Sequence, residues 1–255
     1  MAARDKETPL VEVITDAGDF AEAFRCASEA FGRQANDAIW AAFNPGWDTP
    51  EGQAAGAARW AQRWRAATSG GDGDGDPHTV FLKATLPDTA APAPPPRLIV
   101  GLAIWVQASA VAGRGVVGSD DLRGTMDLDA LHPGDEAEQR FLRQMFRSLI
   151  SQRMAFVRAR AAADPPAVMA LDLCATHPAF QRRGVATALV QWGLDEARRR
   201  GIPEAVMEAS SMGRHVYKHL GFQPQGPDMV YEVDDEFAGR DKPPNVFMVY
   251  SRDSS

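Results

Sequence analysis

The sequence predicts a mixed α/β fold, in which helices flank a central sheet and a helical insertion precedes the central strand. Segments of strand and helix character alternate along the chain, which is typical of a sheet covered by helices. The clearest part, residues 171–222, reads as strand, glycine turn, helix, strand and helix. A length of 255 residues with 45% hydrophobic side chains fits one domain spanning residues 1–255.

The N-terminal half is expected to supply the first strand, the first helices and a hairpin. Phe20, Phe24 and Phe31 recur at helical spacing, and Asn44-Pro45-Gly46 interrupts a second, tryptophan-rich helical region. The predicted elements, in order, are a strand at 10–14, helices at 17–31 and 36–67, and strands at 79–85 and 98–108.

Two low-complexity segments flank the first strand of that hairpin. Residues 69–76 are mostly glycine and aspartate, and residues 87–96 are mostly proline and alanine. Such compositions do not bury a core. We therefore expect two flexible loops.

The proposed insertion, residues 110–165, combines an irregular first part with one long helix over 136–163 that ends before Pro165-Pro166. We expect it to lie across the substrate side. The elements predicted after it are a central strand at 168–176, the helix opened by the glycine turn, a strand at 205–209, a helix at 211–220, and closing strands at 229–233 and 246–250. The glycine-turn helix has an apolar face made of Ala186, Leu189, Val190, Gly193, Leu194 and Ala197.

Composition argues against several classes of function. A net charge of −7 disfavours general nucleic-acid binding, which needs a basic face. We expect no membrane association and a cytoplasmic location, because no long apolar run or apolar signal core is present. Cys26 and Cys174 provide no metal spacing, and His215 and His219 lack a third ligand, so we expect no metal. Monomer and homodimer both remain open.

Residues 181–186, Gln-Arg-Arg-Gly-Val-Ala, have the features of a phosphate-binding turn. They follow a strand and open a helix, whose first N–H groups and positive dipole end suit a pyrophosphate. Gly184 allows the backbone to approach a ligand closely. Arg182 and Arg183 add positive charge beside the anion.

A second motif, Tyr217-Lys218-His219-Leu220-Gly221-Phe222, lies downstream. In this order, and with these elements between them, the two motifs resemble the signature of the GNAT superfamily of acyl-CoA-dependent N-acyltransferases. The lead-in Ala175-Thr176-His177-Pro178 is similar to the family as well. The resemblance covers about a fifth of the chain well. It implies the GNAT fold, with residues 168–222 as the acetyl-CoA-binding core.

The resemblance implies a set of contacts with acetyl-CoA as cosubstrate. The helix start would bind the pyrophosphate, and the backbone of the splayed central strand would pair with the pantetheine arm and polarise the acyl carbonyl. Ser210 stands where relatives often have an asparagine that contacts CoA. The expected contacts are Cys174, Ala175, Thr176, Gln181, Arg182, Arg183, Gly184, Val185, Ala186, Thr187, Ser210 and Tyr217.

Tyr217 is the candidate general acid. The resemblance assigns it to protonate the departing CoA sulfur, and a phenol with a pKa of about 10 allows this role. Ser210, Gly213 and Tyr217 share one helical stripe, so the small residues leave room for a ligand beside the ring.

Two carboxylates are candidates for the base that deprotonates the amine. Glu208 matches a glutamate at a strand end in many relatives. Asp172 lies between Leu171 and Leu173 and is expected to point to the opposite side from both, into the acceptor cleft. Attack by an amine that is already neutral in solution is a third possibility.

The sequence thus predicts an N-acetyltransferase that acts on a primary amine of a small molecule by direct attack in a ternary complex. Trp40, Phe43, Trp47, Asp37 and Asp48 are acceptor-side candidates, although core packing is the better interpretation of the tryptophans. The alternatives are a protein N-terminal or lysine acetyltransferase, and a non-catalytic acyl-CoA-binding domain.

Overall fold

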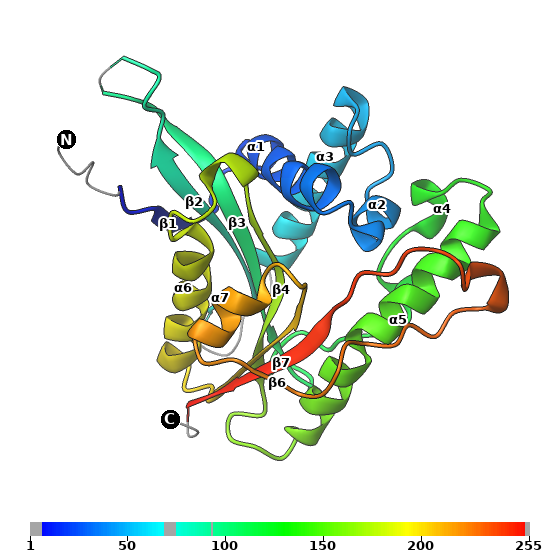
Figure 1. Ribbon diagram of the computed structural model, residues 1–255. Helices are drawn as coiled ribbons and strands as arrows, with labels where there is room; N and C mark the ends of the chain where they lie inside the picture. The colour runs from blue at the N-terminus through cyan, green and yellow to red at the C-terminus, as the bar shows by residue number, and fades with distance from the viewer. Residues whose placement is uncertain (1–6, 69–74, 93, 253–255) are drawn as a thin grey trace.

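The computed structural model describes residues 7–68, 75–92 and 94–252. Figure 1 shows a twisted sheet through the middle of the molecule, with helices on both sides. Within the described residues, seven strands have the order β1-β2-β3-β4-β5-β7-β6. β4 and β5 are parallel, whereas the other neighbouring strands are antiparallel. The predicted mixed sheet flanked by helices is therefore confirmed.

Six of the strands coincide with segments predicted from the sequence, and their ends differ by no more than two residues. The seventh, β6, pairs with β7 through two residues only, which is too short to leave a pattern in the sequence. The strands are β1 (Leu10–Val13), β2 (Thr79–Pro87), β3 (Arg97–Ala108), β4 (Val168–Thr176), β5 (Glu204–Ala209), β6 (Gln223–Pro224) and β7 (Val246–Ser251).

The helices cover the two faces of the sheet with two apolar clusters. Helices α6 and α7 pack on one face, and α1 and α3 pack on the other. A π-helical segment, Ser28–Gln34, continues α1 directly. The helices are α1 (Asp19–Ala27), α2 (Ala38–Phe43), α3 (Pro50–Thr68), α4 (Leu128–Leu131), α5 (Glu136–Ala159), α6 (Val185–Arg199) and α7 (Arg214–His219). No described helix is long and apolar enough to cross a membrane.

The segment assigned to the insertion contains α4 and α5. Helix α5 starts where predicted and ends at Ala159, four residues before the predicted end. It packs against α2 and β5, and Figure 1 shows the chain before β7 running along it. Of the two loops predicted to be flexible, residues 69–74 and 93 lie outside the described residues. In the second loop, the Asp88 N–H donates to the Pro96 carbonyl oxygen at 2.8 Å.

The strand predicted at 229–233 is wrong, because these residues are irregular. The position beside β7 is occupied by β6, which pairs with Met248 and Val249. Tyr231 is buried in a separate cluster with residues of α5. Met229, Tyr231 and Val233 therefore pack on a helix, although the pattern of the segment resembles that of a strand.

Candidate active site

The central feature of the candidate site is a fork between β4 and β5. The parallel ladder joins Met169 to Ala205 and ends with Leu171 opposite Met207. Beyond this point β4 continues along β3 to Thr176, while β5 continues along β7 to Ala209. The strands thus part where the predicted strand-edge residues, Cys174, Ala175 and Thr176, are located.

A β-bulge lies in β4 at the start of the fork. Leu171 is opposite Trp105 and Leu173 is opposite Ile104, so Asp172 is an extra residue in the ladder. Leu171 packs in the cluster under α6, whereas Leu173 packs in the cluster under α1 and α3. The prediction that these two leucines share one face is therefore wrong, because the bulge shifts the alternation of side chains by one residue.

The glycine turn has the geometry expected of an anion site. Gly184 and Arg182 have φ angles of 83° and 61°, in the left-handed region that a valine or leucine disfavours. The first helical bond is donated by the Ala188 N–H to the Gly184 carbonyl oxygen. In the described part of the chain, no acceptor bonds the N–H groups of residues 182–184. These donors are available to a ligand.

The side chains of the turn have separate roles. Gln181 exchanges amide hydrogen bonds with Gln34, at 2.7 and 3.2 Å, and so ties the turn to the π-helical segment. Arg183 lies over the Phe180 ring at 5.5 Å. Val185 is buried in the core, so only its backbone is available to a ligand. Ala186 and Thr187 complete the exposed first turn of α6.

Tyr217 is buried at the fork side of α7, with 9% of its surface exposed. Its hydroxyl lies near the Cys174 thiol, which contributes to the shift of its pKa. A Cβ atom at Gly213 would lie 2.5 Å from the tyrosine ring, so glycine is required there for this packing. Burial, with a further contribution from Cys174, raises the pKa of Tyr217 well above its usual value. The hydroxyl therefore stays protonated at neutral pH.

The two candidate bases are held by arginines from two helices. Arg153 of α5 donates from Nε to Glu208 Oε1 at 3.0 Å and from Nη1 to Asp172 Oδ1 at 2.9 Å. Arg153 Nη2 also pairs with Glu208 Oε2. Arg63 of α3 donates from Nη2 to Asp172 Oδ2 at 2.6 Å. Both carboxylates are thus ion-paired.

These contacts separate the proton affinities of the two carboxylates. Burial opposes ionisation of Asp172, yet Arg63 and Arg153 together hold the pKa of its carboxyl below the usual range. For Glu208, burial outweighs the Arg153 guanidinium and raises the pKa of its carboxyl. Of the two, Glu208 therefore has the higher proton affinity, which a general base requires.

Ser210 and Trp40 make contacts within the fold. The Ser210 carbonyl oxygen accepts from the N–H groups of Gly213 and Arg214, at 3.1 and 3.2 Å, so Ser210 opens α7. Trp40 stacks on Phe31 in the core, with ring centroids 5.4 Å apart. This packing confirms the core interpretation for that tryptophan.

The other acceptor-side candidates lie around the same helices. Asp37 caps α2 by accepting from the Trp40 N–H at 2.9 Å. Phe43 contacts Phe146 of α5, Trp47 lies against Gly32, and Asp48 is exposed. None of these contacts involves the fork.

Sequence reasoning missed Arg63 and Arg153. A signal for Arg153 was present, because it follows Ile150 and precedes Val157 on the apolar stripe of α5. A charge within such a stripe indicates a buried partner. Arg63 lies on a helix of weak amphipathicity and offers no comparable signal.

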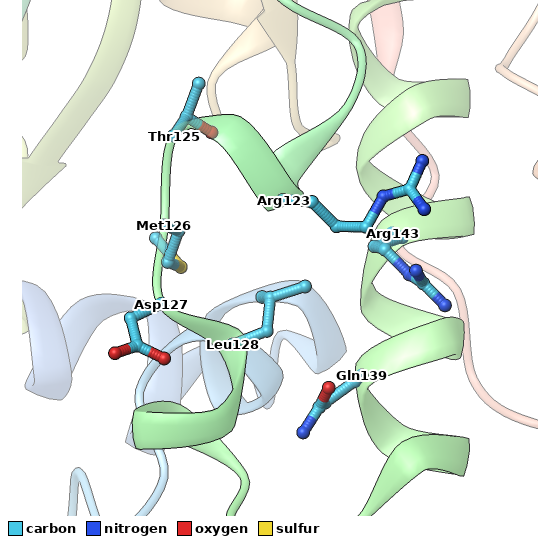
Figure 2. Close-up of a pocket in the computed structure, with 7 residues that line it drawn as sticks. All are labelled: Arg123, Thr125, Met126, Asp127, Leu128, Gln139 and Arg143. Carbon is cyan, nitrogen blue, oxygen red and sulfur yellow. The ribbon is translucent and has the colours of Figure 1, made fainter.

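A cavity of about 560 Å³ is lined by residues of α4, of α5 and of the chain before α4 (Figure 2). Figure 1 shows α4 and α5 on the side of the molecule away from α6. The arginines of this cavity, Arg123 and Arg143, already have Asp121 as a neighbour, and Arg123 Nη2 pairs with that carboxylate at 2.6 Å. It is therefore not part of the candidate site. The lining residues are Arg123, Thr125, Met126, Asp127, Leu128, Gln139 and Arg143.

The fork between β4 and β5, with a helix-opening turn beside it, is the geometry that the resemblance to the GNAT superfamily implies. The model of the acetyltransferase (GNAT) family matches residues 128–222. A search of curated protein sequences found no match.

Three solved structures share the fold over nearly the whole chain. Mosquito arylalkylamine N-acetyltransferase like 5b is 14% identical, with 96% of this chain and 100% of that chain covered and a TM-score of 0.56. Arylalkylamine N-acetyltransferase 2 from Aedes aegypti is also 14% identical, with 96% and 99% covered and a TM-score of 0.57. A variant of agmatine N-acetyltransferase is 12% identical, with 96% and 98% covered and a TM-score of 0.57.

The match begins at the start of α4, within the segment assigned to the insertion, and ends with the Tyr217 motif. Residues 128–222 therefore match the GNAT acetyltransferase family, and over nearly its whole length the chain shares the fold of these three solved structures.

Proposed function

We propose that this protein transfers the acetyl group of acetyl-CoA to a primary amine of a small molecule, by direct attack in a ternary complex. The fork carries the proposal. It opens at Leu171 and Met207, and its β4 arm holds Cys174, whose thiol lies near the Tyr217 hydroxyl. The edge of β4 thus lies between the glycine turn at one end and the proposed proton donor and candidate bases at the other.

The residues present fit acetyl-CoA. The free N–H groups at residues 182–184 and the dipole of α6 suit the pyrophosphate, and a Cβ atom at Gly184 would meet nothing within 4 Å, so the approach is open. The backbone of residues 174–176 would bind the pantetheine arm along the edge that β5 leaves. In these assignments, the protein contacts acetyl-CoA through main-chain groups. Gln181 also ties the turn to Gln34, and the backbone of Ser210 also opens α7.

Gly184→Val is expected to weaken acetyl-CoA binding at least about tenfold, because the side chain would stand in the approach path. The matched control is Gly201→Val at the other end of α6, where φ is 71° and a Cβ atom also meets nothing within 4 Å. Both variants carry a similar strain of about 1–2 kcal/mol. Calorimetric titration with acetyl-CoA measures the difference, and equal affinities for the two variants would contradict the assignment.

Tyr217 has the role of proton donor in this proposal. Its pKa lies well above the usual value, so the hydroxyl keeps its proton until a thiolate develops beside it. Before the reaction, the hydroxyl lies near the Cys174 thiol. During the reaction, the hydroxyl would donate its proton to the sulfur of the leaving CoA thiolate.

Glu208 is the better candidate for the base. Its pKa is raised by burial, whereas two arginines hold the pKa of Asp172 down. A carboxylate with a raised pKa accepts a proton from an ammonium group more readily. Asp172 would then serve to orient Arg63 and Arg153.

Direct attack is favoured over an acyl-cysteine because neither thiol is activated. Burial raises the pKa of Cys174 and of Cys26 to about 12. At pH 8 the thiolate fraction would be roughly 10⁻⁴, far below that of a free cysteine. We expect both thiols to react slowly with a chromogenic disulfide in the native protein and quickly after denaturation. Rapid native reaction of one thiol would reopen the acyl-enzyme route.

The preference for a small acceptor has two supports. Helix α5 and the chain around Tyr231 pack together beside β5, so this side of the fork is covered by protein. The three structural neighbours described above are, by name, acetyltransferases of arylalkylamines and of agmatine. A protein acceptor would need an open groove here.

The test is acetyl-CoA-dependent release of CoA with a panel of arylalkylamines, agmatine and polyamines, alongside lysine and N-terminal peptides. Binding is checked first by thermal unfolding, where ligand at 100 times its dissociation constant adds about 2.7 kcal/mol. Turnover of small amines supports the proposal, and turnover of peptides alone supports the protein-acetyltransferase alternative. Saturable binding without any turnover supports a non-catalytic acyl-CoA-binding domain.

A further inference from the structure

Arg153 lies at the point where the two strands of the fork separate. The last ladder pair is Leu171 with Met207, so Asp172 and Glu208 are the first residues beyond it. The guanidinium of Arg153 bonds both of these carboxylates. Its Nη2 also lies 3.4 Å from the Leu171 carbonyl oxygen. One side chain thus links both arms of the fork immediately beyond the last backbone pair.

The burial of this contact makes it a specific link. Arg153 is 12% exposed and Glu208 is 5% exposed, and the pair uses two guanidinium nitrogens on two carboxylate oxygens. Such bidentate pairs fix geometry as well as charge. Removal of one partner would leave a buried charge without its counter-ion.

The charged and titratable groups around Glu208 come from each element packed against it. Arg153 reaches it from α5, and Asp172 adds a like charge from β4. Arg63 of α3 balances Asp172, and Tyr231 lies near Glu208 in the segment before β7. Arg153 is therefore the guanidinium that directly offsets the charge of Glu208.

We propose that Arg153 is a positioning residue that fixes the fork between β4 and β5 and keeps Glu208 oriented and ionised as the base. The part that concerns Glu208 rests on the acetyl transfer proposed above. The part that concerns the fork does not depend on turnover, because it is a property of the sheet itself.

The chain contains a matched control for this contact. Arg160, one residue beyond the end of α5, pairs with Glu204 through Nε at 2.6 Å and Nη2 at 2.7 Å. Glu204 is at the first residue of β5, before the ladder with β4 begins. Both arginines thus link the region of α5 to β5 by a bidentate pair, but only Arg153 does so at the fork.

The first experiment compares hydrogen–deuterium exchange in the ligand-free wild type, Arg153→Met and Arg160→Met. In Arg153→Met we expect amides of residues 170–173 and 207–209 to exchange at least about tenfold faster than in wild type, because local opening becomes easier. Arg160→Met should leave these amides unchanged and affect those near residue 204. Equal protection of the fork in all three proteins would overturn the proposal.

The second experiment records the pH dependence of kcat/KM for the same proteins and Arg153→Lys. Without Arg153, Glu208 loses its counter-ion and its proton affinity rises, so the acid limb of the profile should move upward by about 1–3 pH units. Lysine keeps the positive charge but not the bidentate geometry, so the acid limb of Arg153→Lys should lie between those of the wild type and Arg153→Met. An unshifted limb in Arg153→Met, or an equal shift in Arg160→Met, would refute the assignment to Glu208.

The two experiments separate the failure of this proposal from failure of the proposed function. If wild type binds acetyl-CoA but acetylates no amine, the acetyl-transfer proposal and the base role fail together. The exchange comparison then still decides whether Arg153 fixes the fork.

Discussion

Tyr217→Phe is expected to lower turnover about 10²- to 10⁴-fold, the range associated with loss of a general acid. Affinity for acetyl-CoA should change by less than about threefold, because the ring and its packing against Gly213 and Phe222 are retained. Steady-state kinetics with the best amine of the panel, together with calorimetric titration of acetyl-CoA, measures both quantities.

The control for this substitution is Tyr250→Phe. Tyr250 also packs on Phe222, with ring centroids 5.6 Å apart, but it lies on β7 and is partly exposed. It should retain near wild-type turnover. If both variants keep full turnover, Tyr217 is not the acid and the leaving thiolate is protonated by solvent.

Gly193→Ala is expected to have the largest effect on stability, with a net loss of about 2 kcal/mol in the free energy of unfolding. A Cβ atom at Gly193 would lie 2.0–2.4 Å from the indole of Trp105, which is fully buried on β3. In an exposed helix the same change would add about 1 kcal/mol of stability. Chemical denaturation of the wild type and the variant measures the difference.

A second substitution distinguishes a clash from general sensitivity of the helix. Trp105→Phe removes part of the indole, so Gly193→Ala should cost less in that background, with a coupling of about 1 kcal/mol or more. Strict additivity of the two changes would contradict the close approach of α6 to β3. Trp105 Nε1 also donates to the Leu189 carbonyl oxygen at 3.3 Å, which ties the same two elements together.

Most of the fold could be predicted because its elements follow simple periodic patterns. Strands such as β4 and helices such as α6 are long and have apolar faces, so their side-chain pattern determines both type and position. The segment 229–233 has a similar pattern, but Met229, Tyr231 and Val233 pack in a cluster with α5. Short-range pattern does not distinguish a strand from an irregular segment with a buried face.

The site was predictable where local geometry decides it, and less so where distant elements meet. The turn at Gly184 needs a left-handed residue before a helix, and the sequence shows this directly. The bulge at Asp172 depends on register with β3, and the pairing of Glu208 with Arg153 joins residues 55 positions apart. Such contacts are set by tertiary packing, which one sequence does not display.

The fork also divides the sheet mechanically. β1 to β4 form one antiparallel block and β5 to β7 another, and a ladder of three residue pairs joins them. A ligand that hydrogen-bonds the open edge of β4 and also contacts the block of β5 to β7 would add a second connection between the two blocks. We therefore expect acetyl-CoA to make the two blocks unfold more cooperatively, in addition to raising the midpoint of thermal unfolding.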